Sequence, residues 1–263
     1  MKKTLYTLCV DNYAPEITKH TFPLMKQWAS KIGADFFVIS ERKFPAFPVV
    51  YEKFQIYELS KQHENDWSIY LDADTLIHPD FWDITSLLTK DTTCSGYTSD
   101  FSLQRFKPDN FFLRDGRYIG KGNWCMIASD WCRDIWRPLE DLTWEEAVKN
   151  ITPTQNELNN GIKPDHLIDD YLISRNIAKF GLKHSLITEI ERSRNIPGGY
   201  LWHTYVKPEG WENAVLPNGT KVFSPEEISA VIKEKGKPSK DFTINELKVV
   251  LLKKQLQVWG VNG

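Results

Sequence analysis

The chain has 263 residues, which is enough for one sizeable hydrophobic core or two small ones. Hydrophobic residues make up 41% and charged residues 26%, a composition typical of globular proteins. The formal net charge of −2 provides no general attraction to nucleic acid or to an anionic membrane, so we expect no nucleic-acid partner.

The first residues, MKKTLYTLCV, are similar in pattern to a signal peptide because two lysines precede a hydrophobic stretch. Asp11 and Asn12 end that stretch early, and no small-residue cleavage site follows it. No apolar run reaches the ~20 residues that a transmembrane helix needs. The sequence therefore predicts a cytoplasmic protein with no transmembrane segment. Its four cysteines form no CxxC motif and are expected to be reduced and buried.

The N-terminal part of the chain alternates between short apolar runs and segments with helical spacing. The apolar runs predict strands at residues 4–10, 35–39 and 67–71, and the helical spacing predicts helices at 15–33 and 52–62. Pro23 lies inside the first helix and is expected to split or kink it. This alternation is typical of a sheet with right-handed crossovers, so the expected fold class is α/β with a mostly parallel central sheet.

The next part of the chain contains further predicted elements and one long loop. We expect helices at 81–88, 129–136 and 165–181, and strands at 93–98, 123–129, 183–189 and 200–205. Asp165 is the expected cap of the third of these helices, and Gly181 its end. The loop at 100–121 is rich in aromatic residues and longer than a connector requires, so we predict that it forms a binding surface.

The C-terminal part holds two predicted helices with clear start signals. Ser224 and Thr243 each precede a glutamate by three residues, the spacing of a capping box. We expect these amphipathic helices to pack on the main domain, with a partner or membrane-surface role as the alternative. The expected organisation is a main domain at 1–211 followed by a helical extension at 212–263.

Two aspartates, Asp72 and Asp74, follow the predicted strand at 67–71 in the stretch WSIYLDADTLI. In an extended segment residues i and i+2 face the same side, so both carboxylates could share one face. Open α/β sheets bind their ligands at the carboxyl ends of the strands. Carboxylates suit Mg²⁺ or Mn²⁺, and such an ion would offset their repulsion and recruit a diphosphate. A polar turn after a strand is the alternative interpretation.

Five stretches carry a resemblance to one enzyme family. They are TLCVDNYAPEI (7–17), EKFQIYEL (52–59), YLDADTLI (70–77), DDYLI (169–173) and WHTYVKPEGW (202–211). In order and spacing they resemble the glycogenin-type and bacterial galactosyltransferases of one retaining family, which have the GT-A fold. The resemblance implies a GT-A catalytic domain at 1–211, a nucleotide-diphosphate sugar donor, UDP-linked in this family, and a glycan or other hydroxyl acceptor. The acceptor is expected to bind across the loop at 100–121 and the turn at 122–124.

The resemblance also implies how the nucleotide is held. Backbone groups of Cys9, Val10 and Asp11 would contact the base, and Tyr13 would stack on it. Lys53 would neutralise the diphosphate or bind the donor sugar. The alternatives are that Tyr13 packs on its own turn and that Lys53 is a solvated helix lysine.

The same resemblance implies a metal site. Asp74 would lie nearest the diphosphate and Asp72 would also lie near the ribose, and His203 would complete the ligand set. An imidazole ligand favours Mn²⁺ over Mg²⁺ because softer nitrogen ligands suit the transition metal. Lys207 would offset charge on the leaving nucleoside diphosphate, and Trp211 keeps the family's distance from the histidine. The alternatives are that His203 is a packed core histidine and that Lys207 is a surface lysine.

The sequence departs from the family at some positions. Val206 stands where the family has glycine, Lys207 comes two positions early, and Asp169 replaces a residue that is often glutamine. Asp169 and Asp170 are the candidate catalytic residues. One of them would act as general base in an inverting transferase, or would steady the donor in a retaining one.

Two alternative functions use the same residues. Haloacid-dehalogenase-like phosphatases also end a strand with Asp-x-Asp, and Asp72 would then be the phosphoryl-accepting nucleophile, with Asp169 and Asp170 completing a Mg²⁺ site. Leu76 departs from that motif, which also usually opens the chain rather than following two strands. A non-catalytic relative that binds sugar nucleotides is the other alternative. The sequence predicts a metal-dependent glycosyltransferase.

Overall fold

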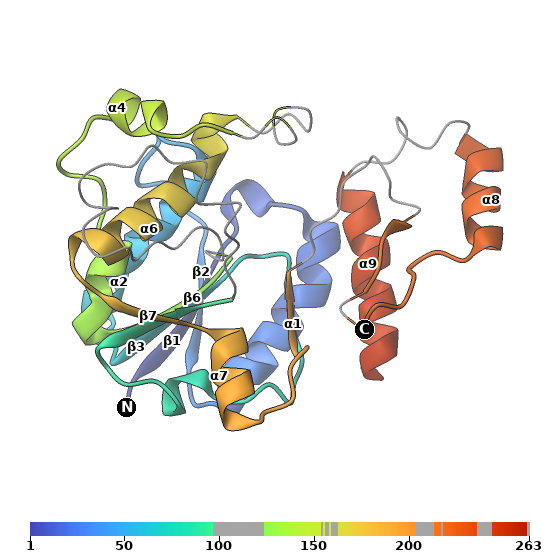
Figure 1. Cartoon of the computed structure of the whole chain (residues 1–263), viewed down its shortest axis with the longest axis horizontal. Helices are drawn as coiled ribbons and strands as arrows, with labels where there is room; N and C mark the ends of the chain where they lie inside the picture. Colours follow the sequence, from blue (N-terminus) through green and yellow to red (C-terminus); the bar gives the residue numbers. More distant parts are fainter. Residues whose placement is uncertain are drawn as a thin grey trace. The chain divides into compact units, whose positions relative to one another are not determined.

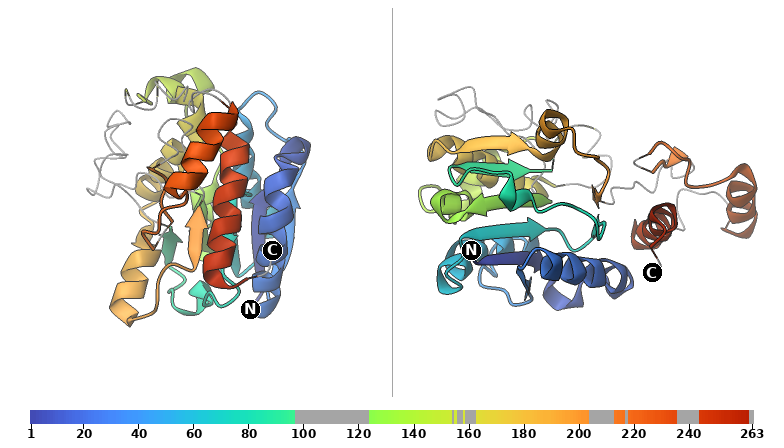
Figure 2. Two further views of the ribbon diagram at one scale, coloured as in Figure 1. Left: turned by 90° about the vertical axis from the view of Figure 1, so that its right-hand side faces the viewer. Right: turned by 90° about the horizontal axis from the view of Figure 1, so that it is seen from below.

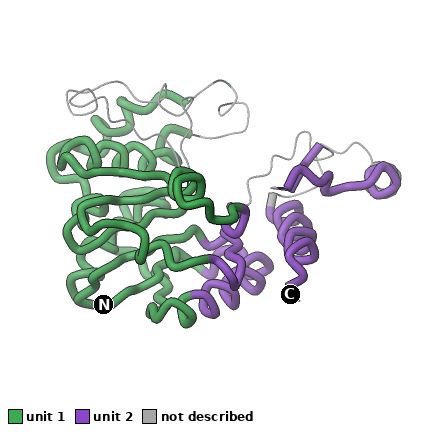
Figure 3. Tube along the Cα trace, turned by 60° about the horizontal axis from the view of Figure 1, so that its bottom comes forward, with its two compact units in different colours: residues 1–11, 29–72, 82–198 green, residues 12–28, 73–81, 199–263 purple. Residues whose placement is uncertain are grey.

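The computed structural model of the chain describes residues 1–96, 124–153, 155, 158, 163–203, 213–216, 218–235 and 244–261 (Figure 1). The chain forms two compact units, one of residues 1–11, 29–72 and 82–198, the other of residues 12–28, 73–81 and 199–263 (Figure 3). The predicted domain boundary at 211 falls outside the described residues. None of the described helices is both long and apolar enough to span a membrane.

Unit 1 is built on a six-stranded sheet with the order β2-β1-β3-β6-β5-β7 (Figures 1 and 2). Strand β1 is parallel to β2 and β3, and β5 is parallel to β7, whereas β6 is antiparallel to both of its neighbours. The strands are β1 (Lys3–Leu8), β2 (Asp35–Ile39), β3 (Trp67–Leu71), β5 (Thr92–Ser95), β6 (Cys125–Ser129) and β7 (Lys183–Leu186). The predicted mostly parallel α/β sheet is therefore confirmed.

The main core of unit 1 lies between this sheet and the helices α2 (Ile56–Gln62) and α6 (Ile168–Lys179). In the register of the sheet Tyr6 is opposite Tyr70, and Tyr70 is opposite Met126, so these three side chains share one face. They are buried in one cluster with Trp136 and Tyr171. Each large apolar side chain that is fully buried stabilises the fold by about 1.5–3 kcal/mol, so this layer fixes the position of α6 and of the strand end of β3.

Unit 2 contains a short antiparallel ribbon of β4 (Thr75–Ile77) and β8 (Leu201–His203). Its helices are α1 (Pro15–Lys31), α8 (Pro225–Lys235) and α9 (Ile244–Trp259). Helix α1 is part of the unit only as far as Trp28. A second hydrophobic cluster includes Leu247 and Leu251 of α9, with Trp202 of β8 packed against it. The cluster therefore joins the last helix to the strand that carries His203.

Several local predictions are confirmed and several are wrong. Pro23 does not split α1, which is one helix from Pro15 to Lys31. Buried Met25 and Trp28 hold the helix across the position where proline removes one hydrogen bond. Ser224 forms the predicted capping box with Glu227: each backbone N–H donates to the other residue's side chain. All four cysteines are buried and free, as expected.

Three predicted helices are shorter or tighter than expected. The one at 81–88 is only a 3₁₀ turn (Ile84–Ser86), because the Asp83 side chain accepts from the Thr85 N–H and closes the turn locally. The one at 129–136 is a 3₁₀ segment (Asp130–Trp136), and the one at 52–62 is a 3₁₀ segment (Val49–Gln55) that leads into α2.

Two further predictions fail at element ends. Asp165 does not cap α6, because it lies inside a 3₁₀ turn (Pro164–Leu167) that precedes the helix. The strand expected at 183–189 stops at Leu186, and helix α7 (Ile187–Arg194) follows. Glu189 accepts a hydrogen bond from the Leu186 N–H (2.9 Å), which satisfies a donor at the start of this helix.

Candidate functional site

The loop after β1 has an unusual backbone. Asp11, Asn12 and Ala14 all have positive φ angles, of 54°, 53° and 43°. Non-glycine residues rarely adopt this left-handed conformation, and such strain is often found at ligand-binding sites. Cys9 is held by a hydrogen bond from its N–H to the Ile39 carbonyl (2.9 Å), while Tyr13 is 42% exposed. This loop is therefore fixed by the sheet on one side and strained in its own backbone.

The two aspartates occupy the connection between β3 and β4. Strand β3 is buried along its whole length and ends at Leu71, and β4 begins at Thr75. Two hydrogen bonds hold the connection: the Asp72 N–H donates to the Trp124 carbonyl (2.8 Å), and the Thr21 hydroxyl donates to the Ala73 carbonyl (2.6 Å). Both aspartates thus follow a central strand at its carboxyl end, as predicted.

Asp74 is buried between two basic side chains. His203 Nε2 lies 3.2 Å from Asp74 Oδ1, and the Nζ of Lys248 in α9 donates to Asp74 Oδ2. The ribbon explains the first contact, because Thr75 of β4 is directly opposite His203 of β8. Burial raises the pKa of Asp74, but His203 and Lys248 lower it by more, so the net pKa is well below the usual range. Asp74 is therefore a carboxylate at neutral pH.

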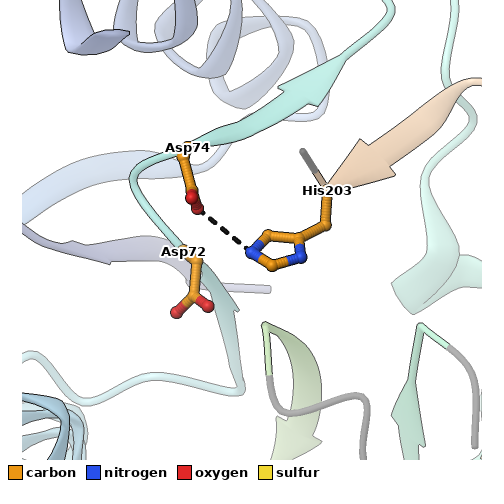
Figure 4. A group of neighbouring side chains, drawn as sticks. All are labelled: Asp72, Asp74 and His203. Atoms are coloured by element: carbon orange, nitrogen blue, oxygen red, sulfur yellow. Dashed lines mark ion pairs between the residues drawn. The ribbon is translucent and has the colours of Figure 1, made fainter. Parts of the chain in front are cut away.

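Asp72, Asp74 and His203 form a group that could hold a metal ion (Figure 4). One ligand atom from each residue lies within 4.8 Å of the others. Two ligands with metal bonds of about 2.1 Å lie at most about 4.2 Å apart, so small side-chain movements bring these atoms to one ion. Two carboxylate oxygens and one imidazole nitrogen are a suitable donor set for a divalent cation such as Mn²⁺.

Lys53 forms a buried network with two carboxylates in unit 1. Its Nζ lies 2.6 Å from Asp169 Oδ2 and 3.6 Å from Asp72 Oδ1, and 4.7 Å from the centre of the Tyr70 ring. The Tyr70 hydroxyl donates to Asp72 Oδ1 (2.5 Å). Burial lowers the pKa of Lys53, but Asp169 and Asp72 raise it to a value above normal, so the side chain is an ammonium ion. The alternative of a solvated lysine is therefore wrong.

Asp169 and Asp170 stand at the start of α6. Both are buried, and the Asp170 N–H donates to Asp169 Oδ1 (3.0 Å). The other oxygen of Asp169 accepts from Lys53, so both oxygens of Asp169 have hydrogen-bond donors. Burial raises the pKa of Asp169 above its ordinary value, although the charge of Lys53 acts in the opposite direction.

The structure brings several predicted residues together. It groups Asp72 with Asp74 and His203, and it places Lys53 against Asp72 and Asp169. Lys207, Trp211 and the predicted acceptor loop at 100–121 lie outside the described residues.

Two residues of the site were not predicted. Tyr70, which orients Asp72, lies directly before Leu71 in β3 and faces the same side as Asp72, so strand alternation could have indicated it. Lys248 lies in a lysine-rich amphipathic helix 174 residues after Asp74, and no spacing rule connects the two positions.

No protein-family model matches the sequence, and no curated protein matches it either. Several solved structures are similar to it. One is a glycosyltransferase involved in the glycosylation of the major capsid of PBCV-1 (10% identity, covering 78% of this chain and 93% of that chain, TM-score 0.42). Another is the galactosyltransferase LgtC in complex with donor and acceptor sugar analogues (12% identity, 95% and 100%, TM-score 0.45).

A third is a mutant of Drosophila β1,4-galactosyltransferase 7 in complex with manganese, UDP-Gal and xylobiose (11% identity, 71% and 65%, TM-score 0.36). All three proteins are glycosyltransferases, the class that the sequence resembles. Because the TM-scores are below 0.5, we base the function of this chain on the geometry of its own residues.

Proposed function

We propose that the protein is a metal-dependent glycosyltransferase that moves a sugar from a nucleotide-diphosphate donor, most simply a UDP-sugar, to a hydroxyl group of a glycan or another acceptor. The observation that carries the proposal is the group of Asp72, Asp74 and His203 directly after the central strand β3. This is the end of the sheet at which α/β proteins bind their ligands.

Asp72, Asp74 and His203 would hold the ion, which we propose to be Mn²⁺, with Mg²⁺ as the alternative. When bound, a divalent cation supplies positive charge for the diphosphate oxygens of the donor and for the leaving nucleoside diphosphate. The β4–β8 ribbon fixes His203 opposite Thr75, so the imidazole stays beside Asp74. The ribbon thus positions the imidazole and the Asp74 carboxylate relative to each other before the donor arrives.

Lys53 and Tyr70 would prepare Asp72 for this role. The Tyr70 hydroxyl fixes one oxygen of Asp72, and the buried ammonium of Lys53 offsets the charges of Asp72 and Asp169. Without such compensation the cost of burying carboxylates near one another would be high. We therefore interpret Lys53 as a residue that positions Asp72 and Asp169 and presents positive charge to the donor.

The roles of the base-binding loop, Lys207 and Trp211 rest on the family resemblance alone. The strained loop with Asp11 would hold the base, and Tyr13 would stack on it. Lys207 and Trp211 would complete the donor site. Because both oxygens of Asp169 already accept hydrogen bonds, we propose that Asp169 acts through Lys53 and that Asp170 is the better candidate for direct contact with substrate.

The geometry gives no support to the phosphatase alternative. Among the described residues, the metal-ligand group contains Asp72, Asp74 and His203 but neither Asp169 nor Asp170. A phosphatase of that class needs the later acidic pair at its metal, whereas here Asp169 accepts a hydrogen bond from Lys53.

The proposal is tested by thermal shift with UDP, Mn²⁺ and both together, followed by an assay of UDP release from a panel of UDP-sugars. We expect UDP to raise Tm only when Mn²⁺ is present, since ligand at ~100 Kd stabilises the folded state by ~2.7 kcal/mol. Asp74→Asn should abolish this shift. Asp141→Asn is the matched control, because Asp141 is also ion-paired, to Arg175 and Lys179, but has no place in the site.

Three outcomes would contradict the proposal. Release of phosphate from sugar phosphates without nucleotide would favour the phosphatase. UDP-sugar binding without any turnover, across donors and glycan acceptors, would favour a non-catalytic relative. Binding of UDP that is equally strong with Mn²⁺ and with a chelator would exclude the metal site.

A further inference from the structure

The last helix of the chain supplies a cation to the predicted metal ligands. Lys248 lies in the first half of α9, and its Nζ donates to Oδ2 of Asp74. The Lys248 side chain is only 13% exposed, and that of Asp74 is 8% exposed. An ammonium ion therefore occupies one of the two oxygens with which Asp74 would bind a divalent cation.

Packing within unit 2 fixes α9 in this position. Leu247 and Leu251, which flank Lys248 on the helix, are buried in the cluster that Trp202 contacts. Trp202 is the neighbour of His203 in β8, so the same cluster places both basic partners of Asp74. At its other end, Trp259 packs edge-on against His78, with ring centroids 5.1 Å apart. The helix is thus anchored on both sides of the lysine.

The pairing of Lys248 with Asp74 would affect a divalent ion and a nucleoside diphosphate in opposite ways. A divalent ion at Asp74 would be repelled by the ammonium and would compete with it for Oδ2. A nucleoside diphosphate brings several negative charges, and a lysine ammonium beside a metal site is a strong donor to phosphate oxygens. The same lysine would therefore oppose the ion alone and favour the ion together with the diphosphate.

We propose that Lys248 makes metal binding depend on the nucleoside diphosphate: without nucleotide it occupies Asp74 and weakens binding of the ion, and with nucleotide its ammonium binds a diphosphate oxygen. The C-terminal helix α9 is then part of the donor site rather than only a packed extension. This inference rests on the proposed function, and it adds a residue that no motif of the sequence indicates.

The test measures two dissociation constants by isothermal titration calorimetry on the full chain: that of Mn²⁺ without nucleotide, and that of UDP at saturating Mn²⁺. Lys248→Met should bind Mn²⁺ alone about tenfold more tightly, because a repelling unit charge is removed. The same variant should bind UDP about tenfold more weakly, because a charge-assisted hydrogen bond is lost. Opposite changes of the two constants are the signature of the proposal.

Lys254→Met is the matched control. Lys254 lies on the same helix and pairs with Glu227 (2.9 Å), so its removal also breaks an ion pair of α9. It should leave both constants within about twofold of the parent, because the exposed pair contributes little to stability and Glu227 is not in the metal-ligand group. Lys248→Gln is the second charge-removing variant, and its amide can still donate to Asp74.

Each other outcome overturns the inference. Constants that both stay within twofold of the parent, or that both weaken, would show that Lys248 serves only as a structural partner of Asp74. The same conclusion follows if Lys248→Met and Lys248→Gln both fail to fold while Lys254→Met folds. If the parent itself binds neither Mn²⁺ nor UDP, the proposed function fails as well, and this distinguishes the two cases.

Discussion

Lys53→Met is expected to destabilise unit 1 strongly, because it removes the positive charge that pairs with the buried Asp169. The Lys53 side chain is 2% exposed and that of Asp169 is 7% exposed, and 2.6 Å separates Nζ from Oδ2. Methionine keeps most of the volume of the lysine stem, so the change acts mainly on charge rather than on packing. Removing one partner of a buried ion pair typically costs about 3–5 kcal/mol. For a chain of this size the lower limit corresponds to a fall in Tm of about 6 °C.

The loss should depend on pH in a definite direction. Burial already raises the pKa of Asp169 in the parent, and Lys53 holds it down in part. Without Lys53 the pKa of Asp169 rises further, so the folded variant binds a proton more tightly than the unfolded chain does. Its stability relative to the parent is therefore regained as the pH falls below the new pKa. Lys53→Met should differ from the parent less at about pH 5 than at about pH 8.

The assay is urea unfolding of parent and variant at both pH values. Lys61→Met is the matched control, because Lys61 lies on the neighbouring helix α2 in an exposed pair with Glu58, and it should unfold like the parent. Adding Asp169→Asn to Lys53→Met should recover part of the loss, since no unpaired charge then remains buried. Unfolding of Lys53→Met that matches the parent at both pH values would refute the buried ion pair.

Further predictions concern the metal ligands, a partly buried histidine and the thiols. His203→Gln should raise the Mn²⁺ concentration needed for the UDP-dependent thermal shift, and an unchanged requirement would remove His203 from the ligand set. Burial lowers the pKa of His184 from 6.5 to about 3, so the unfolded chain gains the proton first as the pH falls. The folded state therefore loses stability below pH 6.5, by about 2 kcal/mol at pH ~5. This loss should be absent from His184→Gln. The four buried thiols should not react with a thiol reagent at about pH 8 until the chain unfolds, since burial raises the pKa of Cys132, for example, to about 11; rapid reaction in the native protein would contradict this.

The sheet could be predicted because its strands are short, apolar and separated by turn signals. Residues 35–39 and 67–71 are strands with the bounds expected, since Ser40 ends the first apolar run, and Asp66 and Asp72 enclose the second. The antiparallel direction of β6 could not be predicted. Direction depends on the path of the chain between β5 and β6, and hydrophobic periodicity gives no information about it.

Helix type was predicted less well than helix position. Asp83 and Ser129 each accept a hydrogen bond from a backbone N–H two residues later, and each stabilises a 3₁₀ turn where a full α-helix was expected. Apolar spacing is nearly the same over one or two turns of either helix type. The two types differ in their backbone hydrogen bonds, which join residues three apart in a 3₁₀ turn and four apart in an α-helix, and apolar spacing does not reveal this difference.

The sequence indicated the carboxylates of the site but not the lysines that offset their charges. Asp72 and Asp74 are recognisable because they follow a strand at a spacing of two. The charges that surround them come from distant parts of the sequence: Lys53, beside Asp72, also pairs with Asp169, 116 residues after it, and Lys248 follows Asp74 by 174 residues. Such pairs depend on how the sheet and helices pack, which a single sequence does not reveal.

Asp72 and Asp74 would repel each other, and each has a lysine beside it: Lys53 beside Asp72 and Lys248 beside Asp74. Lys53 is fully buried and shares its charge between Asp72 and Asp169, so moving it would leave Asp169 unpaired in the core. Lys248 pairs with Asp74, and His203 Nε2, 3.2 Å from the other oxygen of Asp74, stays beside that carboxylate if the lysine moves. Of the two, Lys248 can therefore leave its carboxylate at the smaller cost when an ion and a diphosphate enter. This difference explains why we expect Lys53→Met to act mainly on stability and Lys248→Met mainly on ligand binding, and comparing both variants in both assays tests that division directly.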